Sequence, residues 1–461
     1  MDALAPVLQW LGWLTNSLVT LLWLWFGITL IRERALRGAG ITVAAGLLLS
    51  GLLTALLLMD ATAGNALLGV LLLLLWGLGL LMLLPFGNRE KGRDSGDIAR
   101  VDERDAVFHR FYRLKAGTPE YEKYYAEHPD LKEQDDRLRS GPGLSEAGTQ
   151  TWDPHTSPFM DAAFDTLEPL CRNLDWPAPD TDPVTGSPEL FARRIEGFAR
   201  HAGADMVRTT VLNPDWVYSN NARSEGPWGE DVNLTHTHAV AIAVQMDHAM
   251  MQQAPHHAVA TESSLKYLKA GTVAVLVARY IQSLGYEARA HIDGNYRVMC
   301  IPVAIDAGLG ELGRLGLLMT PQYGPRVRIA IVSTTMPLPQ SPRRDFGVQD
   351  FCSICKKCAR NCPSQSVDSG EKALHNGTYR WQSGQDSCYR YWRAVGSDCG
   401  LCIRVCPYAH PDSAAHHLIR WIITRNPLAR RLAFWADTLL YGSGPAKSQK
   451  APLWHASDAD K

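Results

Sequence analysis

The sequence predicts an α/β domain that follows three N-terminal apolar helices and precedes a cysteine-rich segment. Three observations predict this organisation. The first 86 residues contain three apolar runs, each about as long as a helix that crosses a lipid bilayer. The middle of the chain alternates helical and strand-like patterns, which is typical of α/β folds. Eight of the ten cysteines then lie between Cys352 and Cys406.

Length and charge restrict the classes of function. A chain of 461 residues is long enough for two or three domains. The formal net charge of −1 gives no signal for binding a polyanion, so we expect no nucleic acid among the partners. Two cysteines, Cys171 and Cys300, stand outside the cysteine-rich segment in apolar surroundings. We expect them to be buried free thiols and not a disulfide.

The three apolar runs predict a membrane anchor over residues 1–86. The runs cover Val7–Ile31, Ile41–Met59 and Ala66–Leu84. We expect spanning helices and no cleaved signal peptide, because no basic segment precedes the first run and two more runs follow it. No twin-arginine pair precedes the first run either. A quinol-oxidising or electron-relay module is the alternative, but the first 100 residues hold no histidine that could ligate a haem.

Basic residues predict the orientation of the anchor in the inner membrane. They gather after the first and third runs: Arg32, Arg34, Arg37, Arg89, Lys91 and Arg93. The N-terminal tail and the loop Asp60–Asn65 carry no lysine or arginine. By the positive-inside rule, the N-terminus lies outside and the rest of the chain faces the cytoplasm.

A polar linker with an extended segment over residues 87–158 leads to an α/β domain over residues 159–342. Ser187 and Pro188 predict a helix start, and Ser263 or Ser264 is expected to cap the helix that ends at Gly285. The strands are expected at Met206–Leu212, Ala239–Met246, Val298–Ile305 and Arg326–Ser333.

One glycine-rich stretch fits the dinucleotide fingerprint G-x-G-x-x-G at Gly308, Gly310 and Gly313. That fingerprint needs a long helix after it and an acid about 20 residues further on. Gly316 and Pro321 interrupt any such helix, so a dinucleotide site is not expected. A loop whose backbone approaches another large cofactor is the better interpretation, with these three glycines and Gly316 as binding positions.

A histidine pair, His236 and His238, would place two imidazoles on one face of a strand, as a metal site could use. No third ligand is evident nearby, which favours ordinary histidines of a sheet.

The cysteine-rich segment has the ligand spacing of a bacterial two-cluster ferredoxin. Cys352–Pro363 reads C-x2-C-x2-C-x3-C-P, and Cys399–Pro407 reads C-x2-C-x3-C-P, with Cys388 between them. In this pattern three close thiolates hold one [4Fe–4S] cluster and the cysteine before the proline crosses to the other. A zinc site needs only four ligands and does not use this closure, so two iron–sulfur clusters are expected over residues 343–412.

Several stretches together resemble the corrinoid-dependent reductive dehalogenases. They are Trp216–Ser219, Tyr280–Tyr286, Ile305–Pro321, Gly324–Arg328 and Asp345–Val348, which runs into the cysteine motif. The resemblance covers roughly residue 102 to the C-terminus. It implies a nitroreductase-like α/β core that binds a base-off cobalamin, with the two clusters passing single electrons to cobalt.

The resemblance also implies ligands for each cluster. One cluster would be held by Cys352, Cys355, Cys358 and Cys406. The other, nearer the corrinoid, would be held by Cys362, Cys388, Cys399 and Cys402.

For the chemistry, the resemblance implies a tyrosine that donates a proton beside a basic residue. Motif position indicates Tyr267 as the donor and Arg328 as the basic partner, with Asn295 as a further polar residue. A cation stabilises the phenolate and so eases proton release. The alternatives are Arg326 for the cation and Tyr218, Tyr286 or Tyr296 for the donor.

The expected function is therefore a membrane-anchored reductive dehalogenase. Its partners would be a small organohalide, an external low-potential electron donor and the lipid bilayer. A fused anchor departs from exported family members that are held by a separate membrane protein, so a catabolic role is as well supported as a respiratory one. The alternatives are an epoxyqueuosine-reductase-like enzyme and a non-enzymatic membrane ferredoxin. Residues 413–461 are expected to form a helical tail.

Overall fold

The computed structural model describes residues 5–59, 62–86, 98–223, 226–445 and 452–455. The chain divides into two compact units. The first unit joins Met1–Glu90 to His410–Ala446, and the second joins Lys91–Ala409 to Lys447–Lys461.

The first unit contains the three predicted apolar helices, which are confirmed. They are α1 (Ala5–Arg32), α2 (Leu36–Leu58) and α3 (Thr62–Leu83). All three are long and apolar enough to cross a membrane. Inside the bundle Asn16 Nδ2 donates to Thr54 Oγ1 at 2.9 Å, and Ser50 Oγ donates to Asn16 Oδ1 at 2.8 Å. These bonds satisfy polar groups that the surrounding leucines leave without water.

Some of the residues that predict the orientation of the anchor lie outside the described residues. They are Asp60, Arg89, Lys91 and Arg93. Arg32, Arg34 and Arg37 are described, and they lie at the turn between α1 and α2.

Two further helices belong to the first unit although they come late in the chain. They are α16 (Ala414–Ile423) and α17 (Pro427–Tyr441). Asn426 is the N-cap of α17, since its Oδ1 accepts from the backbone N–H groups of Leu428 and Ala429.

The second unit begins with short helices that precede the sheet. They are η1 (Glu103–Asp105), α4 (Val107–Arg113), α5 (Pro119–Glu127), α6 (Pro129–Arg139) and α7 (Pro158–Cys171). Buried Arg110 donates to Asp135 at 2.9 Å and so ties α4 to α6. Between α6 and α7 the backbone N–H of Thr151 donates to the carbonyl of Val395, which attaches this segment to the cysteine-rich part.

A four-stranded antiparallel sheet forms the centre of the second unit, in the order β1-β2-β6-β3. The strands are β1 (Met206–Val211), β2 (His238–Gln245), β3 (Ala288–His291) and β6 (Val327–Thr334). Three predicted strands are thus confirmed, and β3 is additional.

Helices and short elements surround this sheet. Those before the cysteine-rich part are α8 (Pro188–His201), η2 (Pro214–Trp216), α9 (His248–Met251), α10 (Ala258–Ser283), α11 (Cys300–Asp306), β4 (Glu311–Leu312) and β5 (Leu318–Met319). The rest are α12 (Val348–Cys355), α13 (Lys357–Arg360), β7 (Ala373–His375), β8 (Thr378–Arg380), α14 (Gln385–Val395), α15 (Leu401–Arg404), η3 (Pro407–Ala409) and η4 (Leu453–His455).

Two local predictions are wrong. The predicted strand at Val298–Ile305 is mostly the helix α11, because this short apolar run buries Val303 and Ala304 on the helix side that faces the core. Neither Ser263 nor Ser264 caps α10, which begins at Ala258. The predicted helix start at Ser187 is confirmed, since its Oγ accepts from the N–H of Leu190.

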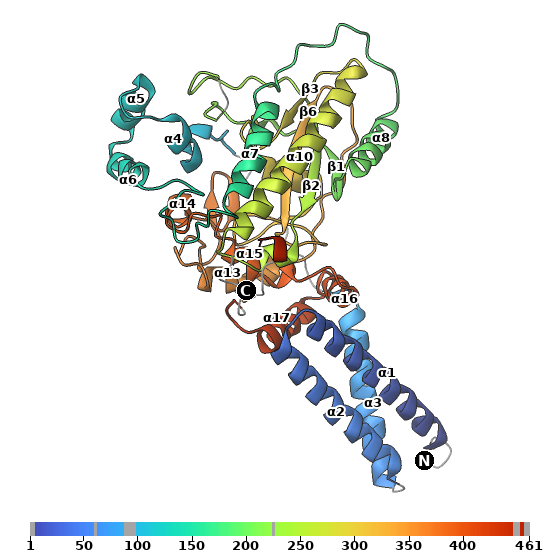
Figure 1. The fold of residues 1–461 in the computed structure, drawn as a ribbon. Helices are drawn as coiled ribbons and strands as arrows, with labels where there is room; N and C mark the ends of the chain where they lie inside the picture. The colour runs from blue at the N-terminus through green and yellow to red at the C-terminus, as the bar shows by residue number, and fades with distance from the viewer. Residues whose placement is uncertain (1–4, 60–61, 87–97, 224–225, 446–451, 456–461) are drawn as a thin grey trace. The chain divides into compact units, whose positions relative to one another are not determined.

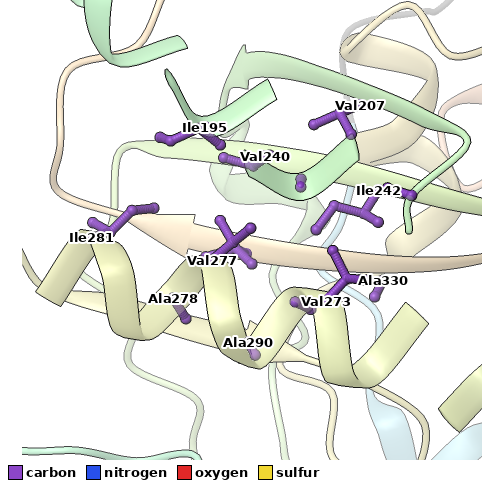
Figure 2. Close-up of a cluster of buried hydrophobic side chains, with 14 of the residues drawn as sticks. Ile195, Val207, Val240, Ile242, Val273, Val277, Ala278, Ile281, Ala290 and Ala330 are labelled. Atoms are coloured by element: carbon purple, nitrogen blue, oxygen red, sulfur yellow. The ribbon is translucent and has the colours of Figure 1, made fainter. Parts of the chain in front are cut away.

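Alternation along the strands divides the core between the two faces of the sheet. On one face Val240 and Ile242 of β2 and Ala330 of β6 pack against Val273 and Val277 of α10, as Figure 2 shows. The opposite face packs against α11. In Figure 1, α10 runs along the sheet with α7 beside it. This packing fixes α10 over the central strand β6, where two candidate site residues meet.

Glu311 predicts a pH dependence of stability. Burial, and then the nearby Asp345 carboxylate, raise its pKa to about 8 from 4.5. A pKa raised in the folded state means that this stabilisation is complete below about pH 4.5 and is lost as pH rises through about 8. We expect the melting temperature of the wild type, relative to Glu311→Gln, to fall between pH 5 and pH 8, roughly the interval between these pKa values. A constant difference across that range would contradict the shift.

Candidate active site and cluster-binding segment

A cavity of about 210 Å³ lies between the segment that joins β3 to α11, the hairpin β4–β5, the start of β6 and α10. Its lining is apolar apart from three phenols, a guanidinium and a thiol. The lining residues are Tyr218, Tyr267, Tyr296, Val298, Cys300, Ile301, Leu317, Leu318, Pro325, Val327, Arg328 and Ile329. A space of this size and character suits a small, mainly apolar organic molecule.

Tyr267 and Arg328, predicted as a pair, meet at this cavity. The Arg328 guanidinium carbon lies 4.7 Å from the centroid of the Tyr267 ring. Arg328 is on β6, and its side chain faces the same side of the sheet as Ala330, toward α10. Tyr267 lies in the tenth position of α10. The packing of α10 on β6 therefore brings the phenol and the cation together.

Two oxygen groups hold Arg328 in this position. Its Nε donates to Ser263 Oγ at 3.0 Å, and Nη2 lies 3.2 Å from Asp398 Oδ2. Ser263 thus contributes to the site from inside α10, where it had been expected to cap the helix. Asp398 directly precedes Cys399, so this ion pair connects the cavity with the cysteine-rich segment.

Burial and charge set the protonation states in the cavity. Burial raises the pKa of Tyr267 above its usual value of 10, and Arg328 partly opposes that rise. Burial works against the charge on Arg328, but Tyr267 and Asp398 outweigh it and the pKa of the guanidinium rises. At neutral pH the site therefore presents a protonated phenol beside a charged cation.

Two other predicted site residues, Asn295 and Arg326, form hydrogen bonds away from the cavity. The Asn295 side chain accepts from Arg289 Nη2 at 2.5 Å and donates to the carbonyl of Cys171 at 2.8 Å, and it does not line the cavity. Fully buried Arg326 donates to the carbonyls of Met246 and Ala409.

Among the alternative tyrosines, Tyr286 donates its hydroxyl to the carbonyl of Val184 and lies outside the cavity lining. Tyr218 and Tyr296 line the cavity with Tyr267. Burial raises the pKa of Tyr218 and that of Tyr296 well above their usual value. Their surroundings therefore make neither tyrosine a stronger acid than a phenol in water.

Sequence reasoning missed several polar contributors. Asp398 could have been noticed as the acid that precedes a cluster-motif cysteine. Arg223 and Asp293 form an ion pair at 3.1 Å, and their charges affect the pKa of Tyr267. They come from loops without a pattern, so no signal in the sequence identified them. Cys300, expected only as a buried thiol, lines the cavity.

The glycine-rich loop is packed against the protein's own chain. A Cβ on Gly308 would lie 2.3 Å from the carbonyl oxygen of Pro342, and one on Gly310 would lie 2.1 Å from that of Met319. Gly313 faces the Met319 side chain, and Gly316 adopts a φ of +77°. Close packing within the protein therefore accounts for Gly308, Gly310 and Gly313, and the left-handed φ accounts for Gly316, although the residues that follow Gly316 line the cavity.

The cysteines form two groups in space. Cys352, Cys355, Cys358 and Cys406 line one small cavity, although Cys406 is far from the others in sequence. Cys352 and Cys358 both have a raised pKa, mainly through burial.

Cys362, Cys388, Cys399 and Cys402 influence the pKa values of one another, and Cys358 of the first group also acts on Cys402. Burial, followed by the thiols of Cys399, Cys358, Cys388 and Cys362, raises the pKa of Cys402 well above its usual value. Burial and the thiol of Cys362 likewise raise the pKa of Cys388 to about 11. Cys388, isolated in sequence, is thus close to the other three.

These thiols are not arranged around a single ion. Within the described ranges, no three histidine, cysteine, aspartate or glutamate side chains are placed to hold one metal ion. In a [4Fe–4S] cluster each thiolate binds a different iron, so its four ligands stand further apart than those of one zinc ion. A group of four buried or half-buried cysteines therefore fits such a cluster. His236, from the histidine pair, instead has Nδ1 2.7 Å from Ser333 Oγ.

Arg314 lies beside the first group of cysteines. It is fully buried, and its Nε donates to the carbonyl of Cys352 at 3.1 Å. Its Nη1 donates to the carbonyls of Asp368 and Gly370, both at 2.8 Å. These bonds attach the hairpin β4–β5 to the segment that carries the thiols.

Comparisons with known proteins agree with this organisation. Residues 351–410 match the family described as a 4Fe-4S dicluster domain. The chain is 31% identical over 317 residues to a tetrachloroethene reductive dehalogenase of Sulfurospirillum multivorans, covering 61% of each chain. It is 31% identical over 306 residues to a tetrachloroethene reductive dehalogenase of Dehalobacter restrictus, covering 56% of this chain and 55% of the relative.

Comparison with solved structures finds a reductive dehalogenase with a similar fold. The catabolic reductive dehalogenase NpRdhA matches with a TM-score of 0.63 at 24% identity, over 78% of this chain and 49% of that one. This chain therefore spans less than two thirds of the curated relatives and about half of that solved structure. The chain is thus similar in sequence to reductive dehalogenases, shares the fold of one, and carries a segment that matches a 4Fe-4S dicluster domain.

Proposed function

We propose that this chain is a reductive dehalogenase that replaces a carbon–halogen bond of a small organohalide with a carbon–hydrogen bond. The observation that carries the proposal is the Tyr267–Arg328 pair at a cavity of about 210 Å³, joined through Asp398 to the cysteine-rich segment. In this proposal Tyr267 is the proton donor, the cavity holds the substrate, and the cysteine-rich segment next to Asp398 supplies the electrons.

The reaction requires two electrons and one proton for each halide released. We assign one [4Fe–4S] cluster to Cys352, Cys355, Cys358 and Cys406, because these thiols share a cavity. We assign the other to Cys362, Cys388, Cys399 and Cys402. An external low-potential donor would supply the electrons.

Cobalamin is the proposed third cofactor, and it would supply the reduced cobalt that removes the halogen. Its support is the family relationship, together with a matched structure described as one for B12-dependent dehalogenation. The cavity is sized for a substrate and not for a corrin, so residues around it, among them Leu317 and Leu318 of the hairpin β4–β5, would hold the cofactor. The backbone around Gly308, Gly310, Gly313 and Gly316 would be part of that surface, and Gly310 and Gly313 pack closely on Met319 of the hairpin.

Tyr267 would donate the proton from its hydroxyl to the carbon that loses the halogen. Its raised pKa keeps it protonated until it is needed. Proton release leaves a phenolate, which is costly in a buried site unless a cation is close. Arg328 is that cation, and Ser263 and Asp398 hold it in place. Asn295, bonded to Arg289, would support the loop that carries Tyr296.

The substrate class follows from the lining of the cavity. Apolar side chains such as Val298, Ile301 and Leu318 form most of the wall, and the phenols and Arg328 form the polar part. A related structure is described in complex with 3-bromo-4-hydroxybenzoic acid. We propose small chloro- or bromo-substituted aromatics and alkenes as the compounds to test.

We further propose that α1, α2 and α3 anchor the enzyme in the inner membrane, with the catalytic part toward the cytoplasm. Length and composition support the spans, and Arg32, Arg34 and Arg37 at one end of the bundle support the orientation. The proposed domains are residues 1–86, 87–158, 159–342, 343–412 and 413–461.

Removal of the Tyr267 hydroxyl should stop catalysis without disturbing the fold. Tyr267→Phe should lower the rate of halide release by roughly 10²- to 10⁴-fold, the usual contribution of a general acid. Iron and corrinoid contents should stay at wild-type levels. Halide release from the chloro- and bromo-compounds, measured by ion chromatography with a chemical reductant, gives the rate.

Tyr286→Phe is the matched control, because its hydroxyl contacts only backbone in a different part of the fold. It should retain wild-type turnover. Wild-type turnover in Tyr267→Phe would move the donor to Tyr218 or Tyr296. No halide from the wild type with any compound would refute the proposed reaction itself.

The cluster assignment predicts which electron centre each cysteine supports. Cys388→Ser should damage only the cluster of Cys362, Cys388, Cys399 and Cys402. The iron content should fall from about eight toward about four atoms per chain. Electron paramagnetic resonance should then show one reduced cluster without the magnetic coupling of a pair.

Cys171→Ser is the control for this experiment, because Cys171 contacts the carbonyl of Asp293 and belongs to neither group. It should keep both clusters. Two intact clusters in Cys388→Ser would show that another residue is the fourth ligand.

A further inference from the structure

The helix α17 exposes an apolar stripe where a soluble protein would bury one. Leu432, Trp435, Ala436 and Leu439 recur at the i, i+3, i+4, i+7 spacing of a single helical face. All four are exposed, and Trp435 is 76% exposed. Arg430, on the opposite face, is buried. Such a face in water marks an interaction surface.

The preceding helix, α16, continues this surface. Its exposed Leu418 and Trp421 are three residues apart and share a face. The guanidinium carbon of Arg425 lies 3.9 Å from the centroid of the Trp421 ring. We call the exposed residues Leu418, Trp421, Leu432, Trp435 and Leu439 the apolar collar.

The collar is fixed at one end of the apolar bundle, within the same unit of the chain. The side chain of Asn426 donates to the carbonyls of Leu81, Met82 and Leu84 at the end of α3, the shortest at 2.7 Å. The start of α17 is thereby attached to the last turn of α3. Since Asn426 also caps α17, one residue satisfies the ends of both helices.

The turn between α1 and α2 holds the collar at the same end. Tyr441 of α17 donates its hydroxyl to Glu33 at 2.9 Å, and His416 Nε2 of α16 lies 3.0 Å from the Glu33 carboxylate. A Cβ on Gly38 of α2 would lie 3.0 Å from the carbonyl oxygen of Leu440. In Figure 1, α16 and α17 lie beside the ends of α1–α3. The collar is therefore at the level where these helices would leave the hydrocarbon.

Charge at this level matches the headgroups of phospholipids. Arg32, Arg34 and Arg37 belong to the turn between α1 and α2, and Arg425 and Arg431 flank the collar. Arg431 and Arg425 are exposed. Tryptophan and leucine beside arginine is the composition of helices that lie in the plane of a membrane interface.

From this arrangement we infer that α16 and α17 lie flat in the cytoplasmic interface of the bilayer, with the apolar collar inserted among the lipid acyl chains. The inference rests on the proposed membrane anchor and extends it. The protein would then contact the bilayer through α1–α3 and, more than 300 residues later in the chain, through α16 and α17. Continuity with the three apolar helices favours phospholipid over a second copy of the chain as the occupant of this surface.

Photocrosslinking of the full-length protein in phosphatidylcholine–phosphatidylglycerol vesicles tests the inference. The substitution Trp435→p-benzoylphenylalanine places a photoreactive group on the collar, and Leu439→p-benzoylphenylalanine repeats the test at a second position. Both side chains are exposed, so the fold should tolerate the change, and wild-type iron content verifies this. After irradiation, mass spectrometry should find phospholipid adducts at both positions.

Two control positions separate the collar from the anchor. Leu48→p-benzoylphenylalanine lies in the middle of α2 on an exposed apolar position and should also form lipid adducts. Leu374→p-benzoylphenylalanine lies on the exposed strand β7, next to charged Lys372 and Glu371, and should form none.

Lipid adducts at Leu48 with none at Trp435 and Leu439 would overturn the inference and leave the anchor intact. Crosslinks from Trp435 to a second copy of the chain would overturn it in favour of a dimer. No adduct at Leu48 would refute the membrane anchor, and the inference with it.

Discussion

The ion pair between Arg328 and Asp398 is the interaction on which the proposed site depends. A guanidinium buried between a sheet and a helix is costly unless anions and hydrogen-bond acceptors surround it. Ser263 and Asp398 supply those partners at 3.0 and 3.2 Å. Because Asp398 precedes Cys399, the same bond sets the position of the cavity relative to the cysteine-rich segment. Removal of either partner would leave the other, a largely buried charge, without its opposite charge, and would disturb both regions together.

The packing of α10 on the sheet is what allows this pair to act on Tyr267. Val273 and Val277 hold α10 against β2 and β6, so the phenol and the guanidinium meet without any direct hydrogen bond between them in the described structure. Burial holds the proton on Tyr267, and the cation limits the cost of losing it. The side chains that pack α10 on the sheet also position Tyr267 beside Arg328. We therefore expect core substitutions near Tyr267 to affect turnover as well as folding.

Much of this organisation was predictable because its signals are local. The cysteine spacing, the three apolar runs and the helix end at Gly285 each depend on residues close together in sequence. The strand predicted at Val298–Ile305 was wrong because a short apolar run fits a helix face as well as a strand. Asp398, Arg223 and Asp293 were missed because only the folded chain brings them near the cavity. The attachment of α16 and α17 to the apolar bundle was hidden for the same reason, since Glu33 and His416 are far apart in sequence.

We propose that the iron–sulfur segment delivers electrons to a corrinoid in the same chain. The most direct measurement is the iron and corrinoid content of the full-length protein, purified without oxygen from cells supplied with cobalamin. Our account predicts about eight irons and about one corrinoid per chain. About eight irons with no corrinoid, even after reconstitution with cobalamin, would contradict it and would identify the chain as a membrane ferredoxin.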